Sequence, residues 1–268
     1  MSFRVTELLA APLNLPVASP DRTPVAAETL LLLPGMMCDS RMWRAQIDDL
    51  DIPTSIPLCD KHDNFVDAAT DILENAPEQF ALAGLSMGGI LALEIWRQAP
   101  QRVSHLALMD TNPFADSPER QSLRLEQIEQ VLKGGLRSLA VDSLKPMYLA
   151  ESNRDDDNLL NTILDMAMDL GPDVFRLQSL ALKNRADSIE TLKQINCPVT
   201  ILCGAEDTLC PVAYHEYMAS RISDCKFVII DDCGHLASME KPDIVTQELR
   251  ELIARNSRSG RYYAQQSG

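Results

Sequence analysis

Residues 80–89 read FALAGLSMGG, and this stretch decides the fold of the chain. Its first half is a short, uncharged apolar run, which predicts a strand that is covered on both faces. The apolar residues after the glycines predict a helix. Ser86 stands at the junction, between Gly84 and Gly88. Serine is common in ordinary turns, but on a very tight strand-to-helix turn its hydroxyl is exposed beside helix amides and can act as a nucleophile.

The segments on either side of this junction alternate between strand and helix patterns. A leucine run within residues 28–35 predicts another buried strand, and apolar residues at helical spacing over 64–75 predict a helix. Strand, helix and strand in succession are typical of a mostly parallel sheet flanked by helices, an α/β fold. The predicted strands cover 28–35, 55–58, 80–85, 102–110, 197–207 and 225–235, and the predicted helices cover 39–50, 64–75, 87–100, 212–222 and 244–254.

Residues 112–196 interrupt this alternation, because they show only helical patterns. A first helix begins near Ser117 and closes at Gly134, a second ends near Gly171, and a third covers 174–182. The insertion is too long for a plain loop and predicts an all-helical cap, or lid. The predicted organisation is an irregular leader over 1–27, a core domain over 28–111 and 197–256, the cap over 112–196, and a flexible tail over 257–268.

Two later strands also end in polar residues, Asp207 and His235. The carboxyl ends of parallel strands form the edge at which ligands bind. A carboxylate there can hold a histidine in the tautomer that accepts a proton from serine. We therefore predict Ser86 as nucleophile, His235 as base and Asp207 as the acid that orients it.

Other readings of these residues stay open. Asp207 also fits a helix cap, since Pro211 and a predicted helix follow. Further candidates for the acid are Glu206, Asp231 and Asp232. Of the remaining histidines, His105 lies inside a predicted strand, which favours a structural role. His62 lies in a polar stretch and His215 on a predicted helix, and neither follows a strand as His235 does.

Acyl transfer places negative charge on the former carbonyl oxygen, and fixed backbone amides stabilise it. One such amide is expected from Met87, directly after the serine. The second is expected from Met36, in the loop LPGMMCD after the first strand, with Met37 as the alternative. These methionines also fit a plain packing role beneath the cap.

The chain resembles the α/β-hydrolase superfamily over nearly all of residues 28–255. The segments that carry the resemblance are LLLPGMMCDSRMW, GLSMGGILALE, CPVTILCGAEDTLCP and DDCGHLASMEKP, and the order Ser86, Asp207, His235 is the order of that fold. It looks most like small bacterial carboxylesterases and lactonases with a helical cap, which implies a Ser-His-Asp triad and no cofactor or metal. The oxyanion loop departs from many relatives, with Pro34-Gly35 where they carry His-Gly.

The expected substrate is a small to medium carboxylic ester or lactone, cleaved through an acyl-enzyme on Ser86. Apolar and aromatic residues are expected to line its pocket: Met37, Phe114, Met147, Tyr148 and Leu236. Two alternatives stay open. One is a cofactor-free perhydrolase, haloperoxidase or acyltransferase on the same triad, and the other is a ligand-binding member of the fold without catalysis.

Composition narrows the class of partner. Of 268 residues, 46 % are hydrophobic, enough for a sizeable core. A net charge of −15 argues against nucleic acid or an anionic membrane as the partner. The seven cysteines are odd in number and lack CxxC spacing, which predicts free thiols in a reducing compartment, the cytoplasm. We find neither a secretory signal nor a membrane-spanning run, and the oligomeric state cannot be read from the sequence.

Overall fold

A computed structural model of the chain describes residues 29–144 and 147–255, without the side chains of Ser143 and Leu144. The leader expected over 1–27 and the tail expected over 257–268 lie outside the described residues.

A six-stranded sheet forms the centre of the molecule, with the strand order β2-β1-β3-β4-β5-β6. All five strand pairs are parallel, which confirms the predicted fold class. The strands are β1 (Thr29–Leu33), β2 (Thr54–Ser55), β3 (Phe80–Leu85), β4 (Val103–Met109), β5 (Val199–Gly204) and β6 (Cys225–Ile230). The edge strand β2 is shorter than the predicted 55–58 and is offset from it. Pro53 and Pro57 flank it, and proline cannot donate a ladder hydrogen bond.

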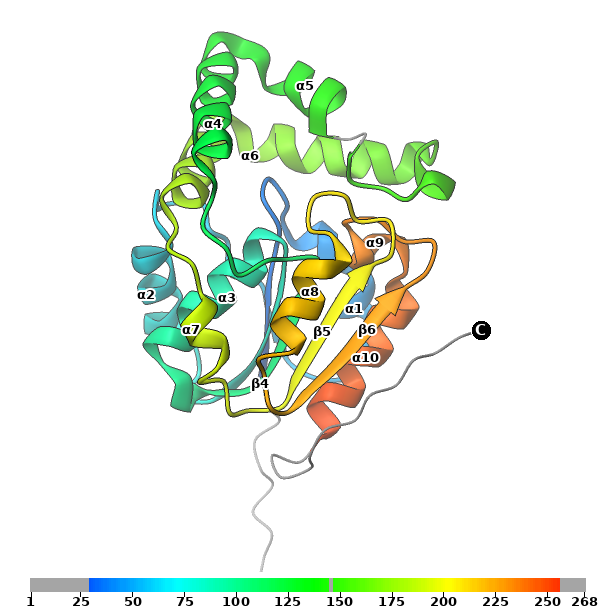
Figure 1. The fold of residues 1–268 in the computed structure, drawn as a ribbon. Coiled ribbons are helices and arrows are strands. Elements are labelled where there is room, and N and C mark those ends of the chain that lie inside the picture. The colour runs from blue at the N-terminus through cyan, green and yellow to red at the C-terminus, as the bar shows by residue number, and fades with distance from the viewer. Residues whose placement is uncertain (1–28, 145–146, 256–268) are drawn as a thin grey trace, which may run out of the picture.

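Helices cover both faces of the sheet (Figure 1). Successive leucines of β1 point to opposite faces, as the pleat of a strand requires. Leu31 and Leu33 pack in one apolar cluster with α2 (Phe65–Asn75), α3 (Met87–Gln98) and α8 (Val212–Ala219). Leu30 and Leu32 pack in a second cluster, which includes residues of α10 (Pro242–Ala254). Burial on both faces explains why this strand is continuously apolar.

The region predicted as one helix over 39–50 divides into two. A 3-10 turn, η1 (Ser40–Trp43), comes first, and α1 (Arg44–Asp49) follows it. Asp39 caps the turn, because its carboxylate accepts the Arg41 amide at 2.9 Å. The structure also contains short helices without a sequence prediction: η2 (Pro100–Arg102), α7 (Ile189–Leu192) and α9 (Ala237–Glu240).

Most of the segments that connect β4 to β5 lie beyond the carboxyl ends of the strands, whereas α7 lies beside α3 (Figure 1). Among the described residues, these segments are helical and include no strand. They are α4 (Pro118–Gln130), η3 (Val131–Gly135), α5 (Leu136–Leu139), η4 (Ala140–Leu144), η6 (Glu151–Asn153), α6 (Asp157–Asn184) and α7. Gly134, with φ 92°, bends the chain from α4 toward α5. Gly171, with φ 79°, breaks the helical path of α6 where two helices were predicted to meet.

No helix within the described residues is long and apolar enough to cross a membrane.

Candidate active site

The turn between β3 and α3 places Ser86 in a strained backbone conformation. Its φ of 55° and ψ of −117° lie in a region of backbone conformation that residues other than glycine rarely adopt. The neighbouring glycines are required by space: a Cβ on Gly84 would lie 2.2 Å from the carbonyl oxygen of Gly88. A Cβ on Gly88 would lie 2.1 Å from the carbonyl oxygen of Leu33. The glycines thus let β1, β3 and α3 approach closely enough for the serine to project from the turn.

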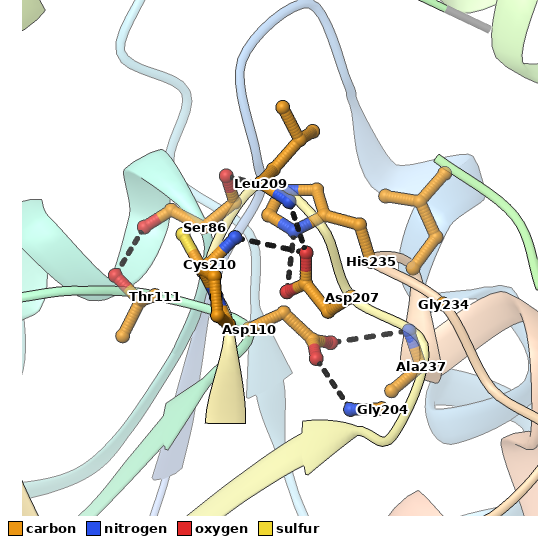
Figure 2. A network of polar contacts seen from close by, with 12 residues as sticks. Ser86, Asp110, Thr111, Gly204, Asp207, Leu209, Cys210, Gly234, His235 and Ala237 are labelled. Atoms are coloured by element: carbon orange, nitrogen blue, oxygen red, sulfur yellow. Dashed lines mark hydrogen bonds and ion pairs between the residues drawn. The ribbon is translucent and has the colours of Figure 1, made fainter. Parts of the chain in front are cut away.

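The structure brings Ser86, His235 and Asp207 together at the carboxyl edge of the sheet (Figure 2). His235 Nε2 lies 2.8 Å from Ser86 Oγ, and His235 Nδ1 lies 2.8 Å from Asp207 Oδ2. The imidazole and the carboxylate are buried, with 3 % and 4 % of each residue exposed. Low exposure strengthens charge interactions and keeps water from competing for these hydrogen bonds. The contacts form one continuous hydrogen-bonded chain from carboxylate to hydroxyl.

Asp207 is held rigidly in this arrangement. Its Oδ1 accepts the backbone amides of Leu209 at 2.8 Å and Cys210 at 2.9 Å, so that Oδ2 remains for the histidine. The other acidic residues considered for the role of Asp207 make different contacts or are exposed. Glu206 accepts the backbone amide of Glu151. Asp232 pairs with Lys241 at the surface, and Asp231 is exposed.

The turn after β4 joins the three segments that carry these groups (Figure 2). Asp110 is fully buried, and its two carboxylate oxygens accept the amides of Gly204 at 3.0 Å and Ala237 at 3.2 Å. Thr111 donates its hydroxyl to the carbonyl of Ser86 at 2.7 Å. Sequence reasoning missed both residues, although polar residues directly after a buried strand were the signal used for Asp207.

Burial shifts the pKa of Asp110 in this turn and of His215, a residue of α8 that contacts the turn. It raises the pKa of Asp110 well above its ordinary value, and the charge of Asp207 raises it further. Burial lowers the pKa of His215 to about 4, so this imidazole is neutral at pH 7. Neutral His215 accepts the Thr111 amide at Nε2, over 2.9 Å, and therefore carries its proton on Nδ1.

The other two histidines are also engaged in structural contacts. His105 Nε2 lies 2.9 Å from the backbone carbonyl of Arg255, and His62 lies 3.4 Å from a carboxylate oxygen of Asp71. The contact of His105 agrees with its predicted structural role.

The loop after β1 passes directly beside the serine. A Cβ built on Gly35 would lie 3.5 Å from the Cβ of Ser86, at ordinary van der Waals distance. On the other side of the serine, Met87 begins α3. The first amides of a helix have no partner within the helix, so they point at the space beside the serine.

Most amides of this loop already have an acceptor. These are the Met42 sulfur for Gly35 at 3.3 Å, the Gln178 side-chain oxygen for Met37 at 2.8 Å, and the Gly35 carbonyl for Cys38 at 3.2 Å. Among the residues that the structure describes, the Met36 and Met87 amides donate to none. These two amides thus have no acceptor among the described residues, whereas the amide of Met37, the alternative, donates to Gln178.

A small apolar cavity lies between this loop and residues of α5 and α6. Its lining consists of Met36, Met37, Cys38, Leu136, Ala140, Tyr148, Ile163, Ala167 and Phe175. Met37 and Tyr148 were predicted for the pocket. The other three predicted residues do not line this cavity. Phe114 instead packs against the rings of Tyr214 and Tyr217, Met147 is 42 % exposed, and Leu236 is buried in the core cluster that includes α10 residues.

Comparison with known proteins assigns the family. The family model described as "alpha/beta hydrolase fold" matches residues 54–242, which is more than half of the chain. The chain belongs to the α/β hydrolases.

Alignments with relatives and with solved structures cover most of this α/β hydrolase. It is 27 % identical over 193 residues to the pimeloyl-[acyl-carrier protein] methyl ester esterase of Aromatoleum aromaticum, covering 68 % of this chain and 77 % of the relative. A thermophilic esterase from Thermogutta terrifontis, solved with malate, aligns with a TM-score of 0.78 and 29 % identity over 85 % of this chain and 90 % of that one. The enol-lactonase of Burkholderia xenovorans LB400 shares the fold, with a TM-score of 0.77 at 20 % identity over 88 % of this chain and 94 % of that one.

Tyr148 contacts the His235 imidazole of this hydrolase through both its ring and its backbone. The two rings stack with centroids 6.0 Å apart at 20°, and the Tyr148 carbonyl accepts the His235 amide at 2.7 Å. Burial raises the pKa of the Tyr148 phenol, so it stays protonated at neutral pH. The residue thus fixes both the backbone and the ring of His235.

Asp207, Cys210 and His235 lie close enough to offer three ligand atoms to a metal, all within 4.8 Å of one another. Their chemistry does not favour one. Burial raises the pKa of Cys210 to about 12, whereas a metal binds the thiolate. Both carboxylate oxygens of Asp207 already accept hydrogen bonds.

Proposed function

We propose that this α/β hydrolase cleaves a small to medium carboxylic ester or lactone through an acyl-enzyme on Ser86. The observation that carries the proposal is the pair of 2.8 Å contacts joining Asp207, His235 and Ser86. This is the geometry in which an imidazole takes the proton of a serine hydroxyl. The esterase names of the Aromatoleum and Thermogutta proteins support an ester as the substrate class.

The reaction follows from the positions of the groups. Ser86 Oγ attacks the carbonyl carbon while His235 Nε2 takes the hydroxyl proton, and Asp207 stabilises the imidazolium through Nδ1–H. The amides of Met36 and Met87 hold the oxyanion. His235 then gives the proton to the leaving alcohol oxygen. In the second half, water attacks the acyl carbon while His235 Nε2 takes its proton. The bond between the acyl carbon and Ser86 Oγ then breaks, and His235 returns the proton to Oγ as the acid leaves.

We also propose that residues 112–196 act as a cap over the site. In the described part of this segment, Ala167 and Phe175 of α6 line the cavity beside the oxyanion loop, and Tyr148 stacks on His235. Such a lid excludes water and shapes the acyl pocket.

The seven cysteines are all free, and six of them are buried, which favours a reducing compartment, the cytoplasm.

The test is covalent labelling of the serine together with turnover. A fluorophosphonate probe should label the wild-type protein, and Ser86→Ala should abolish the labelling. Ser122→Ala, at an exposed serine on α4, is the matched control and should label normally. Wild-type protein should hydrolyse short p-nitrophenyl esters or lactones, and Ser86→Ala should lose about 10⁴-fold or more in kcat, since the triad acts as a unit. An unlabelled wild-type protein that turns over no ester or lactone would reject the function.

A further inference from the structure

We propose that Gln178 of α6 is a positioning residue for the oxyanion loop, an inference that rests on the proposed function. Its side chain is 3 % exposed and uses both ends of its amide. Oε1 accepts the Met37 backbone amide at 2.8 Å, and Nε2 donates to the Cys59 carbonyl at 2.8 Å. One side chain of the cap thereby ties two core loops, which are 141 and 119 residues away in the chain.

The chemistry of the two partners defines the orientation of this side chain. A backbone amide only donates and a carbonyl only accepts, so the position needs one acceptor and one donor at the same distance from the backbone. A carboxylate supplies two acceptors, and an aliphatic side chain supplies neither. Glutamine satisfies both buried backbone groups without adding a charge.

Met37 needs such a hold because its backbone is strained. Its φ of 57° lies in the left-handed region, which non-glycine residues adopt at a cost. Its side chain packs in an apolar cluster with Phe175 and Ala167 of the same cap helix. Helix α6 therefore grips Met37 twice, by its side chain and by its amide.

This grip has a direct consequence for the oxyanion hole. Gln178 removes the Met37 amide as a donor, whereas the Met36 amide, one residue earlier, has no acceptor among the described residues. Because α6 belongs to the cap, any displacement of this helix from the core also releases the loop. Positioning of the cap and formation of the oxyanion hole are thus coupled through one side chain.

The test compares Gln178→Met, Gln178→Glu and the control Ser179→Ala. Methionine keeps the length of the side chain but removes both hydrogen bonds. Glutamate keeps an acceptor for Met37 and, when protonated, a donor for Cys59. Ser179 is the next residue on α6 and equally buried, and its hydroxyl has no partner among the described residues, so its alanine variant should behave as wild type.

We expect the rate of fluorophosphonate labelling and the affinity for a trifluoromethyl ketone to fall together in Gln178→Met. The expected loss is about 10- to 100-fold, since displaced oxyanion donors cost that much in transition-state stabilisation. Gln178→Glu should recover most of it. Competitive inhibition by an aliphatic alcohol, which carries no negatively charged oxygen, should change less than about threefold.

Amide hydrogen exchange read by mass spectrometry supplies an arm independent of activity. In Gln178→Met the peptide that contains Met37 should exchange faster, while peptides from β3 and β5 stay protected. Wild-type labelling rates in Gln178→Met, or slowed labelling with unchanged exchange around Met37, would overturn the assignment. If wild-type protein is not labelled at all, the proposed function fails, and the exchange arm still decides whether Gln178 holds the loop.

Discussion

Hydrogen bonds on both sides of Ser86 keep its strained backbone in place. Its φ of 55° persists because the surrounding turn is over-determined: its amide donates to the Met109 carbonyl at 2.9 Å, and its carbonyl accepts the Thr111 hydroxyl. Strain of this kind costs about 1–3 kcal/mol and needs such compensation. The glycines on either side then leave no room for a methyl group.

The first prediction concerns one of these glycines. Gly88→Ala should lower the free energy of unfolding by about 1–3 kcal/mol or more, since its Cβ would meet the Leu33 carbonyl oxygen at 2.1 Å. Urea denaturation measures this loss. Gly35→Ala is the control, because its Cβ meets only contacts of 3.5 Å and longer. Equal stability of the two variants would contradict the close approach of β1 and α3.

A second residue-scale prediction concerns the pH dependence of stability. The pKa of His215 is about 4 when folded and ordinary, near 6.5, when unfolded. Between these values the unfolded chain binds more protons, so the contribution of His215 to stability is present above pH 6.5 and is lost as the pH falls toward 4. We expect this loss to amount to about 1–3 kcal/mol.

Comparison with His215→Gln isolates the effect, because all other groups titrate alike in both proteins. The wild type should lose stability more steeply than the variant between pH 6.5 and 4, measured by urea denaturation at several pH values. Parallel curves would show that the pKa of His215 is the same in the folded and the unfolded protein.

At the scale of elements, the loops after β3, β4, β5 and β6 act as one unit. Asp110, at the end of β4, bonds the amide of Gly204 at the end of β5 and that of Ala237, which begins α9 after the His235 loop. A carboxylic group with two accepting oxygens is the smallest side chain that can hold both amides. The relative placement of Asp207 and His235 thus depends on Asp110, which lies outside the hydrogen-bonded chain of Ser86, His235 and Asp207.

Asp110→Asn should therefore impair the site without removing any triad member. Its NH₂ group faces one of the two amides, so one hydrogen bond is replaced by two opposed donors at a cost of about 1–3 kcal/mol in stability. We expect kcat/KM for a p-nitrophenyl ester to fall about 10-fold or more. Asp232→Asn, at an aspartate that is exposed, is the control and should keep wild-type activity. Wild-type activity and stability in Asp110→Asn would show that the two loops hold their positions without it.

At the scale of the whole molecule, one buried cluster anchors the two ends of the helical connection between β4 and β5. The Asp116 side chain is fully buried and lies 2.5 Å from Arg124 Nε and 2.8 Å from Arg185 Nη1. Arg185 also donates to the Phe114 carbonyl at 2.8 Å, and the Ser188 amide donates to the Pro113 carbonyl at 2.7 Å. Burial lowers the pKa of Arg185 to about 10, which still leaves it charged at neutral pH.

Removing the shared anion should loosen this anchor. Asp116→Asn leaves two arginines beside a neutral group and should lower the free energy of unfolding by about 3–5 kcal/mol. Denaturation followed by intrinsic fluorescence measures the loss. Asp169→Asn, which breaks the exposed pair with Arg41, should change stability by less than about 1 kcal/mol. A small effect at both positions would mean that apolar packing, without the ion pairs of Asp116, holds the helical connection between β4 and β5 in place.

The sequence by itself determined the parallel sheet, the helical connection between β4 and β5, and the candidate triad. These features depend on short-range patterns: an apolar run, a glycine-bracketed serine, and polar residues at strand ends whose meeting place follows from parallel topology. The folded structure was needed to see that the Met37 amide donates to Gln178 and that Asp110 accepts amides from two neighbouring loops. It also removed Phe114, Met147 and Leu236 from the cavity lining. These outcomes depend on contacts between residues as far as 141 positions apart, and a side chain that meets its partner only after folding leaves no periodic or local signal in the chain.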